Sequence, residues 1–304
     1  MTHQRSEALW ALILIAALAA SACAVPVKAK PARVYAEDVA PAEVEVKAPD
    51  PIPTNDNLNS TLWMQTASEY RTLSVQSYRL AASQLDIALK DRKWTAAIEQ
   101  TEKFANLPAA VILDIDETVL DNSAYQARLV KDGASYDPKT WAAWSAERKA
   151  SAIPGALEFC KLAVSKDVTV FYLTNRVAAE EEDTRANLIA LGFPVDEKVD
   201  TLLMKEEQEG WGSDKGTRRS VVAAQYRVLM LVGDNLGDFF DGAKASVAVR
   251  EALEAQHADK WGTKWIVLPN PAYGSWEGAI YDNQKDIDAR AKAAAKFGAL
   301  RDAR

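Results

Sequence analysis

The chain has 304 residues, of which 48% are hydrophobic and 26% are charged, and its formal net charge is -7. This hydrophobic content is enough for a sizeable core, so the composition excludes a wholly disordered protein. The negative charge disfavours binding to nucleic acid polymers, because such binding depends on Lys and Arg side chains that neutralise phosphates.

The N-terminus is typical of a secretory signal. Arg5 precedes an apolar stretch at 8–20 that is too short to span a bilayer. Residues 20–22 suit an ordinary signal peptidase, whereas Cys23 directly after them resembles a lipoprotein cysteine, although Ala stands where lipoboxes usually carry Leu. We expect a signal peptide over 1–22 and a lipidated Cys23 in a lipoprotein of the cell envelope. A secreted periplasmic protein is the alternative.

Two segments of different composition follow the signal. Residues 23–57 are rich in Pro and Ala and show no periodicity, which predicts an extended tether. From 62 to about 104 the apolar spacing predicts amphipathic helices with one buried face, in which the aromatic residues are part of the core. The residues expected on that face are Trp63, Tyr70, Leu73, Ser77, Leu80, Leu85 and Ala88.

The rest of the chain alternates apolar runs with helical stretches. Buried strands are expected at 109–115, 168–173 and 227–232, and an aromatic-containing strand at 265–268. One helix is expected over 178–191 and ends at Gly192. The alternation predicts an α/β fold with a parallel sheet flanked by helices.

An insert over 123–153 separates the first two predicted strands. It contains Tyr125, Trp141 and Trp144. Because the ends of the strands lie next to it, we expect this segment to form a small cap above them.

Two acids, Asp114 and Asp116, occur at the end of the first predicted strand with a spacing of i, i+2. Ligands of open α/β sheets bind in the crevice outside the carboxyl ends of the strands. Two carboxylates this close repel each other when both are ionised, and a hard divalent ion such as Mg²⁺ relieves that repulsion. The competing interpretation is that both acids cap the following helix.

Three later motifs favour a site over a cap. Thr174 and Asn175 end the second strand with groups that can hydrogen-bond phosphoryl oxygens. Lys215 precedes a predicted helix and could neutralise the charge of a phosphate, although a single Lys is most often a solvated surface residue. Asp234 and Asp238 follow the third strand and a Gly, a pattern typical of metal ligands.

The order D-x-D-x-T, T-N-R, Lys and G-D-x-x-x-D resembles the haloacid dehalogenase superfamily of phosphatases. Segments 114–125 and 233–239 resemble the two signatures of class C bacterial acid phosphatases, the family of outer-membrane lipoprotein 5′-nucleotidases. Segments 62–70 and 268–277 are similar to that family too. The resemblance implies a Rossmann-like, haloacid dehalogenase-like domain over 58–304, with a helical N-terminal extension and the small cap.

The resemblance also implies the roles of four residues in the reaction. Asp114 would be the nucleophile that forms an aspartyl-phosphate. Asp116 would be the general acid and then the base. Thr174 and Lys215 would hold the phosphoryl group and stabilise its charge.

The implied cofactor is Mg²⁺. Its expected site consists of Asp114, Asp116, Asp234 and Asp238, with the backbone carbonyl of Asp116 facing the metal and Asp238 as a supporting acid. Glu117 belongs to the family signature, and a local salt bridge is the expected explanation for it.

The sequence therefore predicts an Mg²⁺-dependent acid phosphatase that hydrolyses phosphomonoesters, including nucleoside 5′-monophosphates. A noncatalytic binding protein on the same fold is a second hypothesis, although the retained acids and Lys215 disfavour it. A haem or metal uptake protein is a third, although His3 and His257 are the only histidines. Phosphotransferase or phosphomutase activity stays open because the motif does not specify the final acceptor.

The expected substrate-binding residues are Asn175, Tyr273 and Trp144, with Tyr273 as the first choice for stacking on a base. Core packing is the competing explanation for each aromatic residue. The expected partners are small phosphomonoesters, a membrane through the lipid anchor and, as one option, a second copy of the chain.

Overall fold

The computed structural model describes residues 55–196 and 198–303. The predicted signal peptide at 1–22, Cys23 and nearly all of the tether lie outside these residues. Within the two described ranges, no helix combines the length and apolar character needed to cross a bilayer.

A five-stranded parallel sheet forms the centre of the fold. Its strands are β1 (Ala109–Leu113), β4 (Thr169–Val177), β5 (Leu202–Lys205), β6 (Arg227–Gly233) and β7 (Trp265–Val267). They are arranged in the order β5-β4-β1-β6-β7, and each neighbouring pair is parallel. This confirms the predicted α/β fold and adds β5, a short edge strand that the sequence analysis did not identify.

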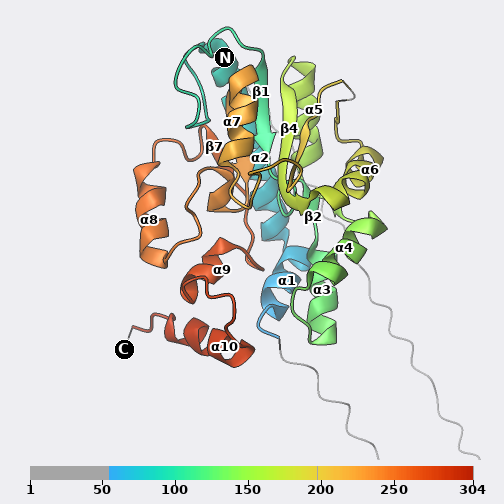
Figure 1. Ribbon diagram of the computed structural model, residues 1–304, viewed down its shortest axis with the longest axis vertical. Helices are drawn as coiled ribbons and strands as arrows, with labels where there is room; N and C mark the ends of the chain where they lie inside the picture. The colour runs from blue at the N-terminus through green and yellow to red at the C-terminus, as the bar shows by residue number, and fades with distance from the viewer. Residues whose placement is uncertain (1–54, 197, 304) are drawn as a thin grey trace, which may run out of the picture. The chain divides into compact units, whose positions relative to one another are not determined.

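Helices cover both faces of this sheet, which explains the continuous apolar runs of its strands (Figure 1). Val111 and Leu113 of β1 belong to the same apolar cluster as residues of α2 (Ser68–Lys90) and α5 (Ala156–Ser165). Ala110 and Ile112 alternate with them and pack in a second cluster with residues of α7 (Gly216–Gln225). Every β1 side chain therefore contributes to one core or the other.

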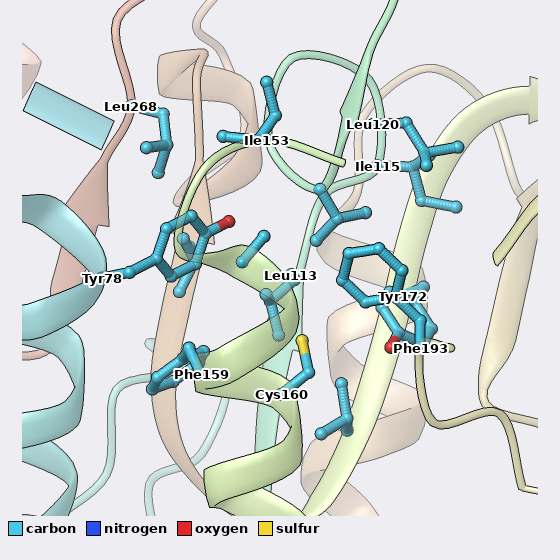
Figure 2. Packing of buried hydrophobic residues seen from close by; sticks show 14 of the residues in the cluster. Tyr78, Leu113, Ile115, Leu120, Ile153, Phe159, Cys160, Tyr172, Phe193 and Leu268 are labelled. Atoms are coloured by element: carbon cyan, nitrogen blue, oxygen red, sulfur yellow. The ribbon is translucent and has the colours of Figure 1, made fainter. Parts of the chain in front are cut away.

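The first apolar cluster lies between α2, α5 and the sheet (Figure 2). The rings of Tyr78 and Phe159 have centroids 5.7 Å apart, and Cys160 is a buried free thiol. The phenol of Tyr78 donates to the carbonyl of Thr118 at 2.7 Å, so this buried polar group is satisfied.

The N-terminal helices differ from the prediction in length and in phase. They are α1 (Leu58–Thr66) and α2, and no helix follows up to Leu107. The chain there is bonded to β6 instead: the backbone amide of Ala96 donates to the carbonyl of Val228 at 2.8 Å, and the indole of Trp94 donates to that of Leu229 at 2.8 Å. Leu73 and Leu80, which were expected inside, are exposed. The buried residues of α2 are Tyr70, Ser74, Tyr78, Ala81, Leu85 and Ala88.

The cap insert folds as two helices and one short strand. They are α3 (Ser123–Asp132), α4 (Pro138–Glu147) and β3 (Ser151–Ala152), which pairs antiparallel with β2 (Leu120–Asp121). Asp137 begins α4 by accepting hydrogen bonds from the backbone amides of Lys139 and Thr140. α3 contacts α1, and α4 contacts α6 (Glu181–Leu191), so the insert is packed on both sides.

The remaining helices follow β4, β6 and β7 in the chain. α6 follows the 3-10 helix η1 (Ala178–Glu180) and ends at Gly192 in a left-handed conformation, as predicted. The others are the 3-10 helix η2 (Leu236–Asp238), α8 (Val247–Gln256), α9 (Ser275–Ile280) and α10 (Ala289–Gly298).

Candidate active site

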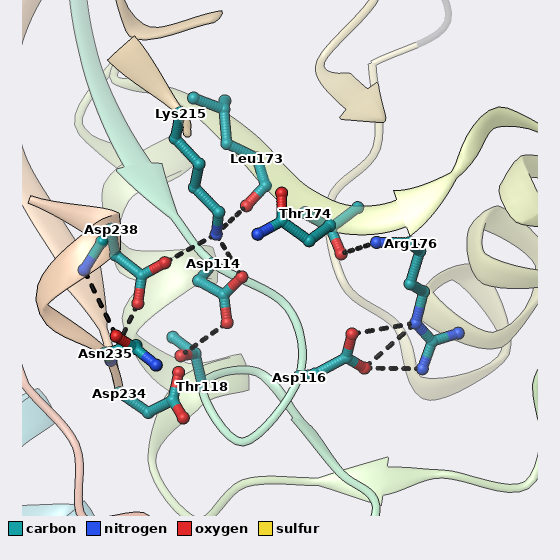
Figure 3. A network of polar contacts seen from close by, with 12 residues as sticks. Asp114, Asp116, Thr118, Leu173, Thr174, Arg176, Lys215, Asp234, Asn235 and Asp238 are labelled. Carbon is teal, nitrogen blue, oxygen red and sulfur yellow. Dashed lines mark hydrogen bonds and ion pairs between the residues drawn. The ribbon is translucent and has the colours of Figure 1, made fainter. Parts of the chain in front are cut away.

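The polar residues predicted from separate motifs meet at the carboxyl ends of the parallel strands (Figure 3). Asp114 directly follows β1, and Asp234 directly follows β6. Lys215 is the residue immediately before α7. Strands that run in parallel end at the same edge of a sheet, so residues far apart in the sequence become neighbours here.

Lys215 joins two of the acids. Its ammonium group donates to Oδ1 of Asp114, pairs with Oδ1 of Asp238 at 2.7 Å and donates to the carbonyl of Leu173 at 2.6 Å. Burial acts to lower the pKa of Lys215, but the carboxylates of Asp114 and Asp238 outweigh it and raise that pKa. The sequence left open a solvated surface lysine, and the structure instead shows a buried, charged one.

Asp114, Asp234 and Asp238 form a group of carboxylates with ligand oxygens within 4.8 Å of one another. Burial and the nearby acids raise the pKa of Asp114 to about 7, although Lys215 opposes the shift. Burial, Asp238 and Asp114 also raise the pKa of Asp234 well above its usual range. A hard divalent cation would relieve this repulsion and prefers oxygen ligands, so the donor set fits a metal ion.

The carboxylate of Asp116 lies outside that group and pairs with Arg176. The distance from Nη2 of Arg176 to Oδ1 of Asp116 is 2.8 Å, and Nε donates to the same oxygen at 3.0 Å. A role for Asp116 at a metal would therefore be left to its backbone carbonyl. No role was predicted for Arg176, because it follows Thr174 and Asn175 beyond the apolar run and only the folded structure shows its buried partners.

Arg176 is itself held by residues of the cap insert and of α6. Its Nη1 donates to Oγ of Ser145 at 3.0 Å and to Oγ1 of Thr184 at 3.1 Å. Asn122 completes the arrangement by donating from Nδ2 to Oδ1 of Asp116 at 2.9 Å. The direction of the Asp116 carboxylate is thus fixed from two sides.

Trp144 does not form a wall of the site, which corrects the prediction. Only 3% of it is exposed, and its indole N–H donates to Oδ1 of Asn122 at 2.9 Å. The large ring is packed against the core, and its single polar atom is used by the protein. Trp144 therefore supports the Asn122 side chain that contacts Asp116.

Glu117 also differs from the expectation. Its buried carboxylate accepts a hydrogen bond from the backbone amide of Asn122 at 2.8 Å, and among the described residues it forms no salt bridge. Its φ angle of 60° lies in the left-handed region. The residue closes the turn between Asp116 and β2, so its role is local and structural.

Thr174 and Asn175 lie on the β4 side of the site and are both engaged by the protein. The Thr174 hydroxyl oxygen accepts from the backbone amide of Arg176 at 3.0 Å. The Asn175 side chain accepts from Arg218 at 2.8 Å and donates to the carbonyl of Ser213 at 3.0 Å. Both polar ends of the Asn175 side chain thus have protein partners.

The loop after β7 reaches the acids through Asn270, another residue to which the sequence analysis gave no role. Its Nδ2 donates to Oδ2 of Asp234 at 2.7 Å. Its Oδ1 accepts from the backbone amides of Ala272 at 2.9 Å and of Tyr273 at 3.3 Å. This side chain fixes the backbone of the half-buried Tyr273 relative to the site.

Two glycines permit the close packing of the acids. A side chain at Gly233 would clash with the carboxylate of Asp238, and one at Gly216 would clash with that of Asp241. Glycine is needed at both positions because an acidic side chain lies against the backbone, and not because of an unusual φ angle.

Comparison with known proteins gives a family match and similar solved structures. The family described as HAD superfamily, subfamily IIIB (acid phosphatase) matches residues 20–276. The solved class C acid phosphatase from Bacillus anthracis is 34% identical, with a TM-score of 0.71 over 81% of this chain and 97% of that chain. The structure of the Bacillus anthracis class C enzyme with tungstate bound is 33% identical, with a TM-score of 0.70 and the same coverage.

Proposed function

This chain belongs to the HAD superfamily, subfamily IIIB, of acid phosphatases, and we propose that it uses Mg²⁺ and an aspartyl-phosphate on Asp114 to hydrolyse its substrates. It is a phosphomonoesterase. We further propose that nucleoside 5′-monophosphates are among its substrates. The observation that carries the mechanism is the contact of Lys215 with both Asp114 and Asp238 beside Asp234.

In the first step, an Asp114 carboxylate oxygen attacks phosphorus. A new P–O bond to Asp114 forms while the P–O bond to the leaving alcohol breaks, and the leaving oxygen takes the electron pair. Asp116 supplies a proton to that oxygen. Lys215 stabilises the negative charge on the phosphoryl group, since a buried cation acts more strongly than one in water.

In the second step, water attacks the phosphorus of the aspartyl-phosphate. Asp116 takes a proton from the water, the P–O bond to Asp114 breaks, and inorganic phosphate leaves. The Thr174 hydroxyl would help in both steps. This role is supported by the backbone amide of Arg176, which donates to the hydroxyl oxygen and leaves the hydroxyl proton to donate to a phosphoryl oxygen.

The acids Asp114, Asp234 and Asp238 would hold the metal, with the backbone carbonyl of Asp116 as an additional ligand. A bound Mg²⁺ would offset the negative charge of the carboxylates and of the phosphate and polarise a phosphoryl oxygen. The carboxylate group described above supports this assignment.

Nucleotide substrates are supported by the position of Tyr273. Its backbone is held by Asn270, which also contacts Asp234, so its ring lies on a loop fixed to the acids. Stacking of a base on an aromatic ring contributes about 1–3 kcal/mol. Tyr273 is therefore the residue that we assign to the nucleoside part of the substrate.

The decisive experiment combines turnover with trapping of the intermediate. A panel of phosphomonoesters is assayed with the mature protein after chelation by EDTA and again after Mg²⁺ is restored. Rapid quenching with ³²P-labelled substrate should give acid-stable label on the wild type and none on Asp114→Asn. Full activity after exhaustive chelation would refute the metal requirement, and absence of label during turnover would refute the covalent step.

The same assay separates hydrolysis from phosphoryl transfer. Hydrolysis releases one inorganic phosphate for each alcohol, whatever the concentration of an added acceptor alcohol. If less inorganic phosphate than alcohol were released, and the difference grew with the acceptor concentration, the protein would instead be a phosphotransferase, which shares the first step.

For location, we propose a lipoprotein of the outer membrane anchored at Cys23, with secretion into the periplasm as the alternative. The proposal is supported by the apolar stretch at 8–20 that precedes Cys23. Mass spectrometry of the mature N-terminus tests it, since an unmodified Cys23 would favour ordinary secretion. A homodimer is the remaining partner expected from the sequence, and light scattering of the purified chain tests it.

A further inference from the structure

The first turns of α7 carry two consecutive arginines, Arg218 and Arg219, whose side chains are fully buried. A charged side chain in the interior requires hydrogen-bonding partners, since leaving it unpaired is costly. Most of their acceptors lie in the loops that carry the site residues, although Nε of Arg218 has no partner among the described residues. Neither arginine has a role in the reaction described above.

Arg218 contacts the β4 side of the site. Its Nη1 donates to the carbonyl of Thr174, and its Nη2 donates to Oδ1 of Asn175 at 2.8 Å and to the carbonyl of Gly212 at 2.9 Å. The guanidinium therefore links the end of β4 to the segment that leads into Lys215. No ligand oxygen of the acid group is among its hydrogen-bond partners.

Arg219 contacts the opposite side, the loop after β6. Its Nη1 donates to the carbonyls of Gly237 at 3.3 Å and Asp238 at 3.1 Å, and its Nη2 pairs with Oδ1 of Asp241 at 3.0 Å. Nε pairs with Glu99 at 2.8 Å. This guanidinium fixes the backbone of the turn that carries Asp238.

Asp241 extends this second link back to α7. The oxygen that pairs with Arg219 also accepts from the backbone amide of Gly216 at 2.9 Å. The helix start that carries Lys215 and the loop that carries Asp238 are thus joined by the contacts of Arg219 and of the Gly216 amide, besides the Lys215–Asp238 ion pair.

We propose that Arg218 and Arg219 are positioning residues and that each of them holds a different half of the site in place. Arg218 holds the backbone at Thr174, in the phosphoryl-binding half, and Arg219 holds the backbone at Asp238, in the metal-binding half. Consecutive residues of an α-helix point about 100° apart, so one helix can direct neighbouring side chains to two different loops. This inference rests on the proposed function, because it assumes that the acids bind a metal.

The test compares Arg218→Lys and Arg219→Lys with Arg227→Lys. Lysine keeps the charge but loses the forked geometry that spans several acceptors. Arg227 is the matched control, because it is also buried and donates to backbone carbonyls, those of Ala88 at 3.1 Å and Asp91 at 2.6 Å, outside the site.

The dissociation constant of Mn²⁺, the inhibition constant of phosphate and the thermal stability are measured for each protein. Mn²⁺ binding to metal-free protein is followed by electron paramagnetic resonance, phosphate inhibition is measured at saturating Mg²⁺, and Tm is measured without metal. Arg219→Lys should weaken Mn²⁺ binding by about tenfold or more while the Ki of phosphate changes little. Arg218→Lys should raise the Ki of phosphate by about tenfold and leave Mn²⁺ binding near wild type.

The control should lower Tm without moving either constant. Equal changes of both constants in Arg218→Lys and Arg219→Lys, or similar changes in Arg227→Lys, would overturn the inference, since a merely structural role predicts no separation. A wild type that neither binds Mn²⁺ nor hydrolyses phosphomonoesters would instead overturn the proposed function.

A second pair of variants covers the event that an arginine variant does not fold. Asp241→Asn removes the charge partner of Arg219 at a half-exposed position and should weaken Mn²⁺ binding alone. Arg218→Gln keeps a hydrogen-bond donor in the interior and should raise the Ki of phosphate alone. An Asp241→Asn variant with wild-type Mn²⁺ affinity would contradict the role given to Arg219.

Discussion

Leu113 and Asp114 are joined by one peptide bond, yet they belong to two regions with opposite properties. Leu113 is fully buried in the apolar cluster of Figure 2, whereas Asp114, 8% exposed, lies in the polar network of Figure 3. The apolar region gains free energy from burial itself. The polar region loses free energy when its charges are buried and depends on Lys215 to compensate.

Because of this difference, substitutions at neighbouring residues should affect different properties: the unfolding free energy in the apolar region and the reaction in the polar region. A truncation in the apolar region should cost unfolding free energy and leave the reaction intact in the folded molecules. Removal of the Asp114 charge in the polar region should abolish the reaction and cost little stability, because it also removes a carboxylate that repels Asp234 and Asp238.

The largest effect is expected for Asp114→Asn. An amide cannot form the aspartyl-phosphate, so kcat should fall by about 10⁴-fold or more. Tm in EDTA should stay near or above that of the wild type, since Lys215 keeps its pairing with Asp238. Steady-state assays and calorimetry measure the two quantities. A variant with wild-type kcat would show that Asp114 is not the nucleophile.

Leu113→Ala should give the converse result. The cavity left in the apolar cluster should lower the unfolding free energy by about 2–5 kcal/mol. The kcat of the folded protein should change by less than a factor of about three, because the backbone before Asp114 is held by β4 and β6 on both sides. Urea unfolding and assays at low temperature test this, and a large loss of kcat with little loss of stability would break the comparison.

Asp116→Asn should lower kcat by about 10²-fold for an alkyl phosphate, since general acid catalysis typically contributes this much. The loss should be smaller for an aryl phosphate, whose leaving group needs less protonation. Parallel assays of p-nitrophenyl phosphate and glycerol phosphate measure the ratio. Equal losses for the two substrates would argue against the role of Asp116 as the acid.

Tyr273→Ala should affect substrate choice more than catalysis. We expect KM for adenosine 5′-monophosphate to rise by about tenfold, which corresponds to about 1.4 kcal/mol of stacking, with little change for glycerol phosphate. Trp144→Phe is the control, since its buried ring contacts Asn122 and should not discriminate between the substrates. Parallel shifts for both substrates in Tyr273→Ala would remove the stacking assignment.

The last prediction concerns the pH dependence of stability. In metal-free protein the folded-state pKa of Asp114 is raised to about 7 from 3.8, so between these values the folded state holds a proton that the unfolded state has lost. The stability of the wild type relative to Asp114→Asn should therefore fall with rising pH across this window, by about 1 kcal/mol per pH unit. Chemical unfolding of both proteins in EDTA at pH 5 and pH 7 measures it, and a difference independent of pH would contradict the shift.

The sequence predicted the residues whose position follows from the order of the strands. Asp114 and Asp234 directly follow apolar runs, so the parallel sheet alone brings them to one edge. The sequence could not predict which side chains of other elements contact these acids. Arg176 and Asn270 contact Asp116 and Asp234 through side-chain geometry, which no local pattern encodes.

The misjudged elements have similar causes. β5 has only four residues at an edge of the sheet, and in the segment before β1 the backbone amide of Ala96 bonds to β6 and not within a helix. Trp144 was expected near the substrate because aromatic residues of an insert can line a site. Its hydrogen bond to Asn122 buries the indole, and this tertiary contact exists only in the folded protein.

The central place of β1 has a consequence for hydrogen exchange. Both of its edges are hydrogen-bonded, to β4 and to β6, and both of its faces are covered. Its backbone amides should therefore exchange with solvent deuterium only when the whole domain unfolds, whereas those of the short β2–β3 pair should exchange through local openings. Asp114 would thus be attached to a slowly exchanging strand, while the β2–β3 pair that follows it in the chain exchanges faster.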